Sequence, residues 1–150
     1  MKLAEALIER ADLKTQIAQI VSRMKENALV QEGDSPGEDV AELLNMYETA
    51  MSSLETLIIR INKTNSETAL DEISLADAIA RRDCLKAKIS AYRAVKEASL
   101  ARRDRYSGSE IKYVRTTDIA GLQRVIDDYS KQYRELDTRI QARNWSADLL

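Results

Sequence analysis

The stretch that decides the fold is VAELLNMYETAMSSLETLIIRI, residues 40–61. Its apolar residues recur at alternating spacings of 4 and 3: Val40, Leu44, Tyr47, Met51, Leu54, Ile58 and Ile61. This spacing puts them on one face of an α-helix and is typical of helices that pack along a seam. We predict a helix from Pro36 to about Asn62 that starts at a capping box formed by Ser35 and Glu38.

Three other stretches show the same period and predict helices over about 2–27, 75–105 and 117–143, with Trp145 just beyond the last. Ser74 and Asp77 supply a cap for the third predicted helix. The polar residues 62–68 are predicted to connect the second helix to the third. The predicted inward faces are Leu3, Ala6, Leu7, Leu13, Ile17, Ile20 and Met24; Leu75, Ala78, Arg82, Leu85, Ile89 and Tyr92; and Ile119, Leu122, Ile126, Tyr129, Tyr133, Leu136 and Ile140.

Composition agrees with an all-α fold. The 150 residues include one Pro, four Gly and no Phe, and 32% are charged, which is far from the mix that sandwiches and barrels use for their turns. We expect a single domain, residues 1–150, in which four long antiparallel helices form an up-down bundle. At one end, Ile111–Arg115 could pair with Leu29–Gln31 as a short two-strand cap.

The charge and apolar patterns predict a cytoplasmic protein. The opening residues MKLAEALIERADLK alternate charged and apolar groups, unlike a secretory signal. No apolar run approaches the roughly 20 residues that span a bilayer, and the single cysteine cannot form an internal disulfide. The net charge of −2 gives no overall attraction to nucleic acid or anionic lipid.

The residue inventory excludes several kinds of chemistry. Without histidine the chain cannot form a Ser-His-Asp or Cys-His triad, the usual di-iron ligand set or an ordinary zinc site. Gly-rich phosphate loops are absent from the sequence. We therefore predict no catalytic residue, no metal and no cofactor, and we expect the protein not to be an enzyme. Acid–base chemistry or metal binding by carboxylates alone is left open.

A stripe of small residues follows the third predicted helix. Its members, again spaced by 4 and 3, are Ala80, Cys84, Ala87, Ala91, Ala94, Ala98 and Ala101. Small side chains let two helices approach closely. We predict that this helix is buried on two sides, at the centre of the bundle or against a second subunit, and that Cys84 is a compact core residue.

Arginine interrupts two of the predicted seams. If four helices run up and down with short connections, five residues lie at one level: Arg10, Glu55, Arg82, Asp83 and Asp137. A buried guanidinium must be paired, because desolvating it alone costs several kcal/mol. We favour an ion layer that fixes helix register, or arginines that reach the surface; the alternative is a site for a small anion or metabolite.

A second polar cluster lies in residues 102–115, with five basic and two acidic residues and two tyrosines. Such a mixture can bind phosphate backbones and stack bases. Residues 26–48, however, hold seven acidic residues and no basic one, so we expect the two segments to neutralise each other. The candidate site residues of this cluster, which also suit caps and turns, are Arg105, Tyr106, Ser107, Ser109, Glu110 and Lys112.

The sequence resembles a family of small bacterial proteins whose members are often labelled septicolysin. The similarity runs through MKLAEALIERADL (1–13), VQEG (30–33), INKTN (61–65), ARRD (80–83), RYSGSEIKYV (105–114), LDTRIQ (136–141) and NW (144–145). The resemblance implies a bacterial, mainly helical protein and carries over no catalytic residue. The label implies a cytolysin, which this sequence does not support, because it has no long apolar segment.

We expect a non-enzymatic structural or interaction protein that forms a homo-oligomer. The second hypothesis is a binder of a small anion or metabolite, and the third is a membrane-active toxin.

Overall fold

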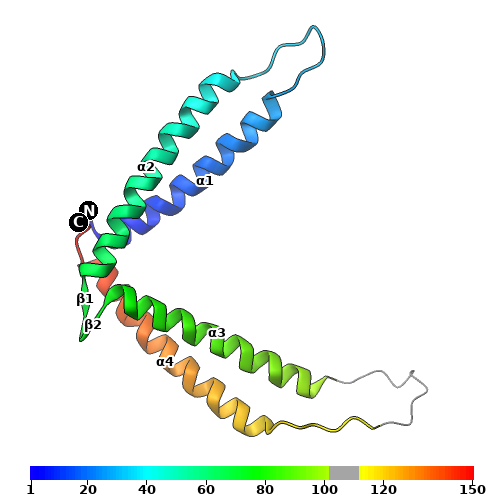
Figure 1. The fold of residues 1–150 in the computed structure, drawn as a ribbon, viewed down its shortest axis with the longest axis vertical. Coiled ribbons are helices and arrows are strands. Elements are labelled where there is room, and N and C mark those ends of the chain that lie inside the picture. The colour runs from blue at the N-terminus through cyan, green and yellow to red at the C-terminus, as the bar shows by residue number, and fades with distance from the viewer. Residues whose placement is uncertain (102–111) are drawn as a thin grey trace. The chain divides into compact units, whose positions relative to one another are not determined.

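The structure, a computed structural model, describes residues 1–101 and 112–150. Four long helices make up most of it: α1 (Leu3–Asn27), α2 (Val40–Glu67), α3 (Leu75–Leu100) and α4 (Ile119–Ser146) (Figure 1). Strands β1 (Ala69–Leu70) and β2 (Ile73–Ser74) pair antiparallel between α2 and α3. The predicted all-α class with four long helices is confirmed.

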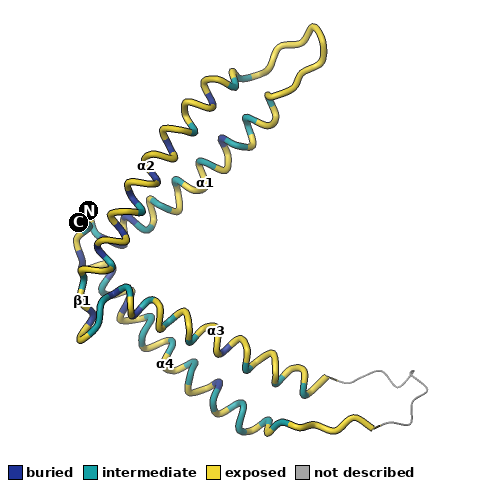
Figure 2. Tube along the Cα trace, in the orientation of Figure 1, coloured by how far each residue is buried: buried dark blue, intermediate teal, exposed yellow. Residues whose placement is uncertain are grey.

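The chain forms two compact units. Unit 1 contains Met1–Leu75 and Gln141–Leu150, and unit 2 contains Ala76–Ile140. In unit 1, α1 and α2 lie side by side as an antiparallel pair, and the two ends of the chain meet (Figure 1). Buried residues recur along both helices of the pair (Figure 2), and those on α2 are Leu43, Ala50, Leu54, Leu57, Ile61 and Thr64.

The seam of α2 is rotated from its predicted position. Leu54 and Ile61 are buried as predicted, but Leu44 and Met51 are 48% and 37% exposed. The residues directly before them, Leu43 and Ala50, are buried instead, and Leu57 is buried more deeply than the half-buried Ile58. The pattern was ambiguous because apolar residues stand next to each other at these steps. In the structure the smaller Ala50 faces α1, where a small side chain allows a closer approach.

The start of α2 was also predicted wrongly. The helix begins at Val40, and the Asp39 side chain accepts a hydrogen bond of 2.8 Å from the Ala41 amide. Glu38 does not complete a capping box: its carboxylate is bound by Arg23, and its amide donates to the Asn27 side chain at 3.0 Å. An acidic residue at the end of a loop can bond to the helix before it or cap the helix after it. Here Glu38 bonds to Arg23 and Asn27 of the preceding helix, α1.

The predicted connection at 62–68 is mostly helical, because α2 continues to Glu67. The turn is made instead by a two-residue β-hairpin, in which Leu70 pairs with Ile73. Asp71 has a φ of 56°, the left-handed conformation that such a turn requires and that Asp tolerates. The Leu75 amide then donates to the Thr68 carbonyl at 2.8 Å, which joins the start of α3 to the hairpin.

In unit 2, α3 packs against α4 (Figure 1). The rings of Tyr92 and Tyr129 meet edge to face with centroids 5.7 Å apart, and Lys96 Nζ donates to Gln123 Oε1 at 2.5 Å. The predicted inward faces of both helices are confirmed, since every member is buried or half-buried. Only four apolar side chains of the described part of unit 2 are buried: Ala78, Ile89, Ile126 and Ile140.

Two helix ends and one expected strand pair differ from prediction. Helix α3 ends at Leu100 and not near Arg105, and α4 extends to Ser146, so that Trp145 is helical. The expected strand pair is not formed by the described residues: neither 29–31 nor 112–115 is a strand. Apolar–polar alternation over five residues was too short a signal to identify a strand without a partner.

Candidate functional site

Three of the five residues predicted to form a polar layer lie together in unit 2. Arg82 on α3 binds Asp83 through Nε and Nη2, at 3.0 and 2.8 Å, and binds Asp137 on α4 through Nη1 at 3.2 Å. The Arg82 side chain is 22% exposed and that of Asp137 31%. The cluster therefore lies at the edge of the α3–α4 seam, partly accessible to water.

Two opposing effects act on the Arg82 guanidinium. Partial burial lowers its pKa, but hydrogen bonds to Asp83 and Asp137 outweigh burial, so that the pKa is raised overall. The guanidinium stays charged, and its charge is offset by two carboxylates. This arrangement fits an ion cluster between helices better than a vacant anion site.

The other two members of the predicted layer belong to unit 1. Arg10 is half-buried on α1 and Glu55 is exposed on α2. In the described part of the chain, neither residue takes part in an ion pair. A layer shared by all four helices, and its use by a ligand, stay predictions.

The loop candidates fall mostly outside the described residues, namely Arg105, Tyr106, Ser107, Ser109 and Glu110. Lys112 is described and lies exposed in an irregular segment before α4. Neutralisation of the basic segment by residues 26–48 likewise stays a prediction.

The small-residue stripe of α3 is accessible along its whole length. All seven predicted interface residues are exposed: Ala80, Cys84, Ala87, Ala91, Ala94, Ala98 and Ala101. The predictions that α3 is buried on two sides of the bundle and that Cys84 is a core residue are therefore wrong for the chain by itself. Small size made these positions resemble a core, but α4 covers only the other side of the helix.

A polar node at the chain ends was not predicted. Thr64 is fully buried; its Oγ1 donates to the Arg60 carbonyl at 2.8 Å and accepts from the Leu150 amide at 3.0 Å. Lys2 Nζ pairs with Asp148 at 2.8 Å, and a hydrogen bond from Lys2 lowers the pKa of Asp148. Only the polar content of INKTN and NW in the sequence hinted at this node.

A groove on unit 2 was also missed. It is an open groove of about 610 Å³ between α3 and α4, and three of its lining residues are the exposed Lys86, Arg93 and Arg134. In sequence these positions are part of the polar faces of two helices, and nothing distinguished them from an ordinary solvated surface.

Residues 10–149 match a family of unknown function, DUF6847. The chain belongs to this family. A crystal structure described as that of a functionally unknown conserved protein from Corynebacterium diphtheriae is similar over 100% of this chain and 99% of that one, with 39% identity and a TM-score of 0.93. No curated protein matches the chain.

Membership of DUF6847 corrects the earlier resemblance: the match is to this family and not to a septicolysin-like one. The resemblance rested on short separate segments, whereas the family match extends over residues 10–149.

Among the described residues of this DUF6847 chain, no helix is long and apolar enough to cross a membrane. No group of three or more Cys, Asp or Glu side chains among them is placed to hold a metal ion.

Proposed function

We propose that the protein is a non-enzymatic structural or interaction protein that associates with copies of itself through the alanine face of α3, the seven residues from Ala80 to Ala101 named above. The observation that carries this proposal is the exposure of all seven residues, six on α3 and Ala101 directly after it, in a unit that buries few apolar side chains. We also propose that the protein works in a reducing compartment, the cytoplasm, because its single cysteine, Cys84, is free and exposed.

The energetic argument concerns the thin core of unit 2. Two helices side by side bury one stripe each, and most helical stability comes from such packing. A second copy placed on the alanine face would bury another stripe of α3 at close range, because no large side chain separates the backbones. Association would thus stabilise the unit that has the smaller core.

A competing face exists on α2, where Leu44 and Met51 are exposed one heptad apart. Larger apolar side chains could also hold two copies together, although they keep helix axes farther apart. The experiment must therefore distinguish α3 from α2.

The test is the mass in solution, measured by light scattering behind a sizing column at two concentrations, for three variants. Ala91→Glu puts a charge at the middle of the alanine face and is expected to weaken association at least tenfold. Met51→Glu tests the α2 face, and Ala18→Glu is the matched control at an exposed alanine of α1. A monomeric wild type, or loss of association in Met51→Glu with Ala91→Glu unaffected, would contradict the proposal.

A further inference from the structure

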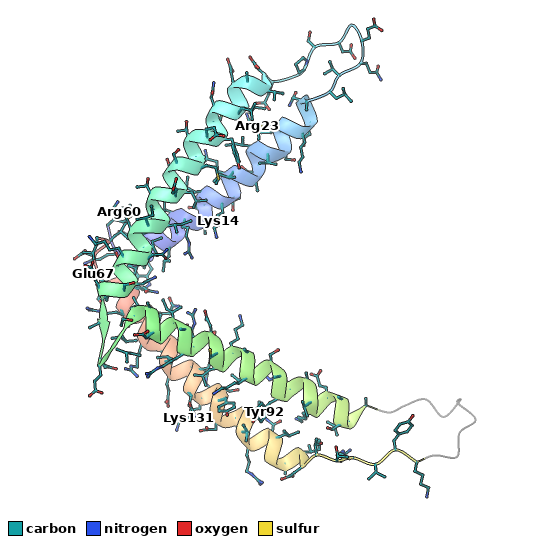
Figure 3. All side chains as sticks on the ribbon, in the orientation of Figure 1. Lys14, Arg23, Arg60, Glu67, Tyr92 and Lys131 are labelled. Carbon is teal, nitrogen blue, oxygen red and sulfur yellow. The ribbon has the colours of Figure 1, made fainter. Side chains whose placement is uncertain are left out.

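The groove between α3 and α4 has a basic lining. Lys86, Ser90, Arg93, Ala94 and Glu97 line it from α3, and Ser130, Tyr133 and Arg134 line it from α4. Buried Ile89 also lines the groove. The groove can be located in Figure 3 from two labelled residues. Tyr92 on α3 is the sequence neighbour of Arg93, and Lys131 on α4 is the sequence neighbour of Ser130.

Unlike Arg82, the three cations of the groove form no ion pair among the described residues, although the carboxylate of Glu97 lines the same groove. Within residues 1–101 and 112–150, no ion pair involves Lys86, Arg93 or Arg134. Lys86 and Arg93 are seven residues apart and so lie on one face of α3, and Arg134 lines the same groove from α4. Like charges gathered in a concavity attract an anion, even in a protein of net charge −2.

The neutral side chains of the groove define the ligand more closely. The hydroxyls of Ser90, Ser130 and Tyr133 are hydrogen-bond donors suited to phosphate oxygens. Arginine matches phosphate with two parallel hydrogen bonds. The half-buried ring of Tyr133 offers a flat surface on which a planar ring can stack, and the volume is within the usual range for small-molecule sites.

We propose that this groove binds a small organic phosphate that carries a planar ring, of the nucleotide class. Arg93, Arg134 and Lys86 hold the phosphates, Tyr133 stacks on the ring, and Glu97 accepts a hydrogen bond from a sugar hydroxyl or ring amine. The site is separate from the Arg82 cluster and needs no second copy of the chain, although Ala94 of the proposed self-association face also lines the groove.

The test is titration calorimetry of the full chain with ATP, pyrophosphate and adenosine at low and high salt. ATP is expected to bind more tightly than either fragment and to weaken as salt rises. The double variant Arg93→Gln/Arg134→Gln should lose at least tenfold in affinity for ATP. Tyr133→Leu should weaken ATP but leave pyrophosphate within twofold.

Arg124→Gln is the matched control, because Arg124 is an exposed arginine of α4 that does not line the groove. It should bind ATP within twofold of wild type, and far-UV circular dichroism should show that all variants remain helical. The proposal is overturned if ATP at millimolar concentration gives no binding, or if the double variant binds as well as wild type. It is also overturned if Arg124→Gln loses as much affinity as the double variant, or if a single-stranded oligonucleotide binds far more tightly than ATP, which would indicate a polymeric partner.

Discussion

Thr64 joins two backbone segments that are 86 residues apart in sequence. Its hydroxyl donates to the Arg60 carbonyl and accepts from the Leu150 amide, and the side chain is fully buried. A threonine inside a helix usually bonds only the carbonyl four residues before it. Here the second bond stabilises tertiary structure, and a sequence-based reading of the polar run at 62–68 could not find it, because the partner lies at the other end of the chain.

Thr64→Val should lower the free energy of unfolding by about 0.5–1.5 kcal/mol, because the partly buried hydrogen bond from the Leu150 amide is lost. Thr56→Val is the control: Thr56 makes the same bond within α2, to Ser52, but is exposed. Its effect should stay within about 0.5 kcal/mol. Urea unfolding followed by circular dichroism measures both, and equal effects would show that the bond to Leu150 contributes nothing.

The pairing of Glu38 with Arg23 predicts a dependence on pH. The hydrogen bond from Arg23 lowers the pKa of Glu38 below its ordinary value. A carboxyl whose pKa is lowered by folding stabilises the protein above its unfolded pKa, near 4, and loses that contribution as pH falls through the lowered value.

Between pH 6 and pH 3, the urea midpoint of wild type should therefore fall further than that of Glu38→Gln. Glu48→Gln is the control, because Glu48 makes no ion pair in the described part of the chain and should leave the pH dependence close to that of wild type. If the urea midpoint of Glu38→Gln changes with pH as that of wild type does, the Glu38–Arg23 pair contributes nothing to stability.

At the scale of elements, α2 shows what periodicity can and cannot predict. Its existence and length were predictable, because a 3-4 pattern over 22 residues has no other simple interpretation. The face that α2 buries was not predictable, because Leu43 and Leu44 are equally apolar and only packing against α1 determines which of them is buried. On α3 and α4, apolar residues have polar neighbours at most steps, and there the predicted faces were confirmed.

The two readings of how α2 begins give opposite predictions for one pair of variants. Asp39→Ala removes the observed cap, so the Ala41 amide loses its acceptor, and the free energy of unfolding should fall by about 1 kcal/mol. Ser35→Ala removes the cap predicted from the sequence and should change stability by less than about 0.5 kcal/mol. Thermal unfolding of the two variants measures the difference. A larger loss of stability in Ser35→Ala would support the helix start at Pro36 that the sequence predicts.

At the scale of the whole molecule, sequence patterns could not show that either surface behind a proposal is exposed. The alanine stripe was visible in the sequence, but the same pattern suited a buried helix and an exposed one. The groove was not visible, because Lys86, Arg93 and Arg134 acquire meaning only when α3 and α4 bring them to one concavity. Patterns along one helix report which face is apolar, whereas a site depends on which polar faces of two helices become neighbours.

The unequal cores of the two units lead to a prediction about the whole chain. Among the described residues, unit 1 buries twelve apolar side chains and unit 2 buries four, and opening free energies follow local burial. In dilute protein, native-state hydrogen exchange should therefore show lower protection for amides in 76–100 and 119–140 than for those in α1 and α2.

If copies associate through α3, protection in unit 2 should rise with protein concentration while that in unit 1 stays nearly constant, and Ala91→Glu should abolish the rise. Equal protection of the two units at low concentration would contradict the link between burial and opening, and a concentration effect confined to unit 1 would place the interface on α1 or α2.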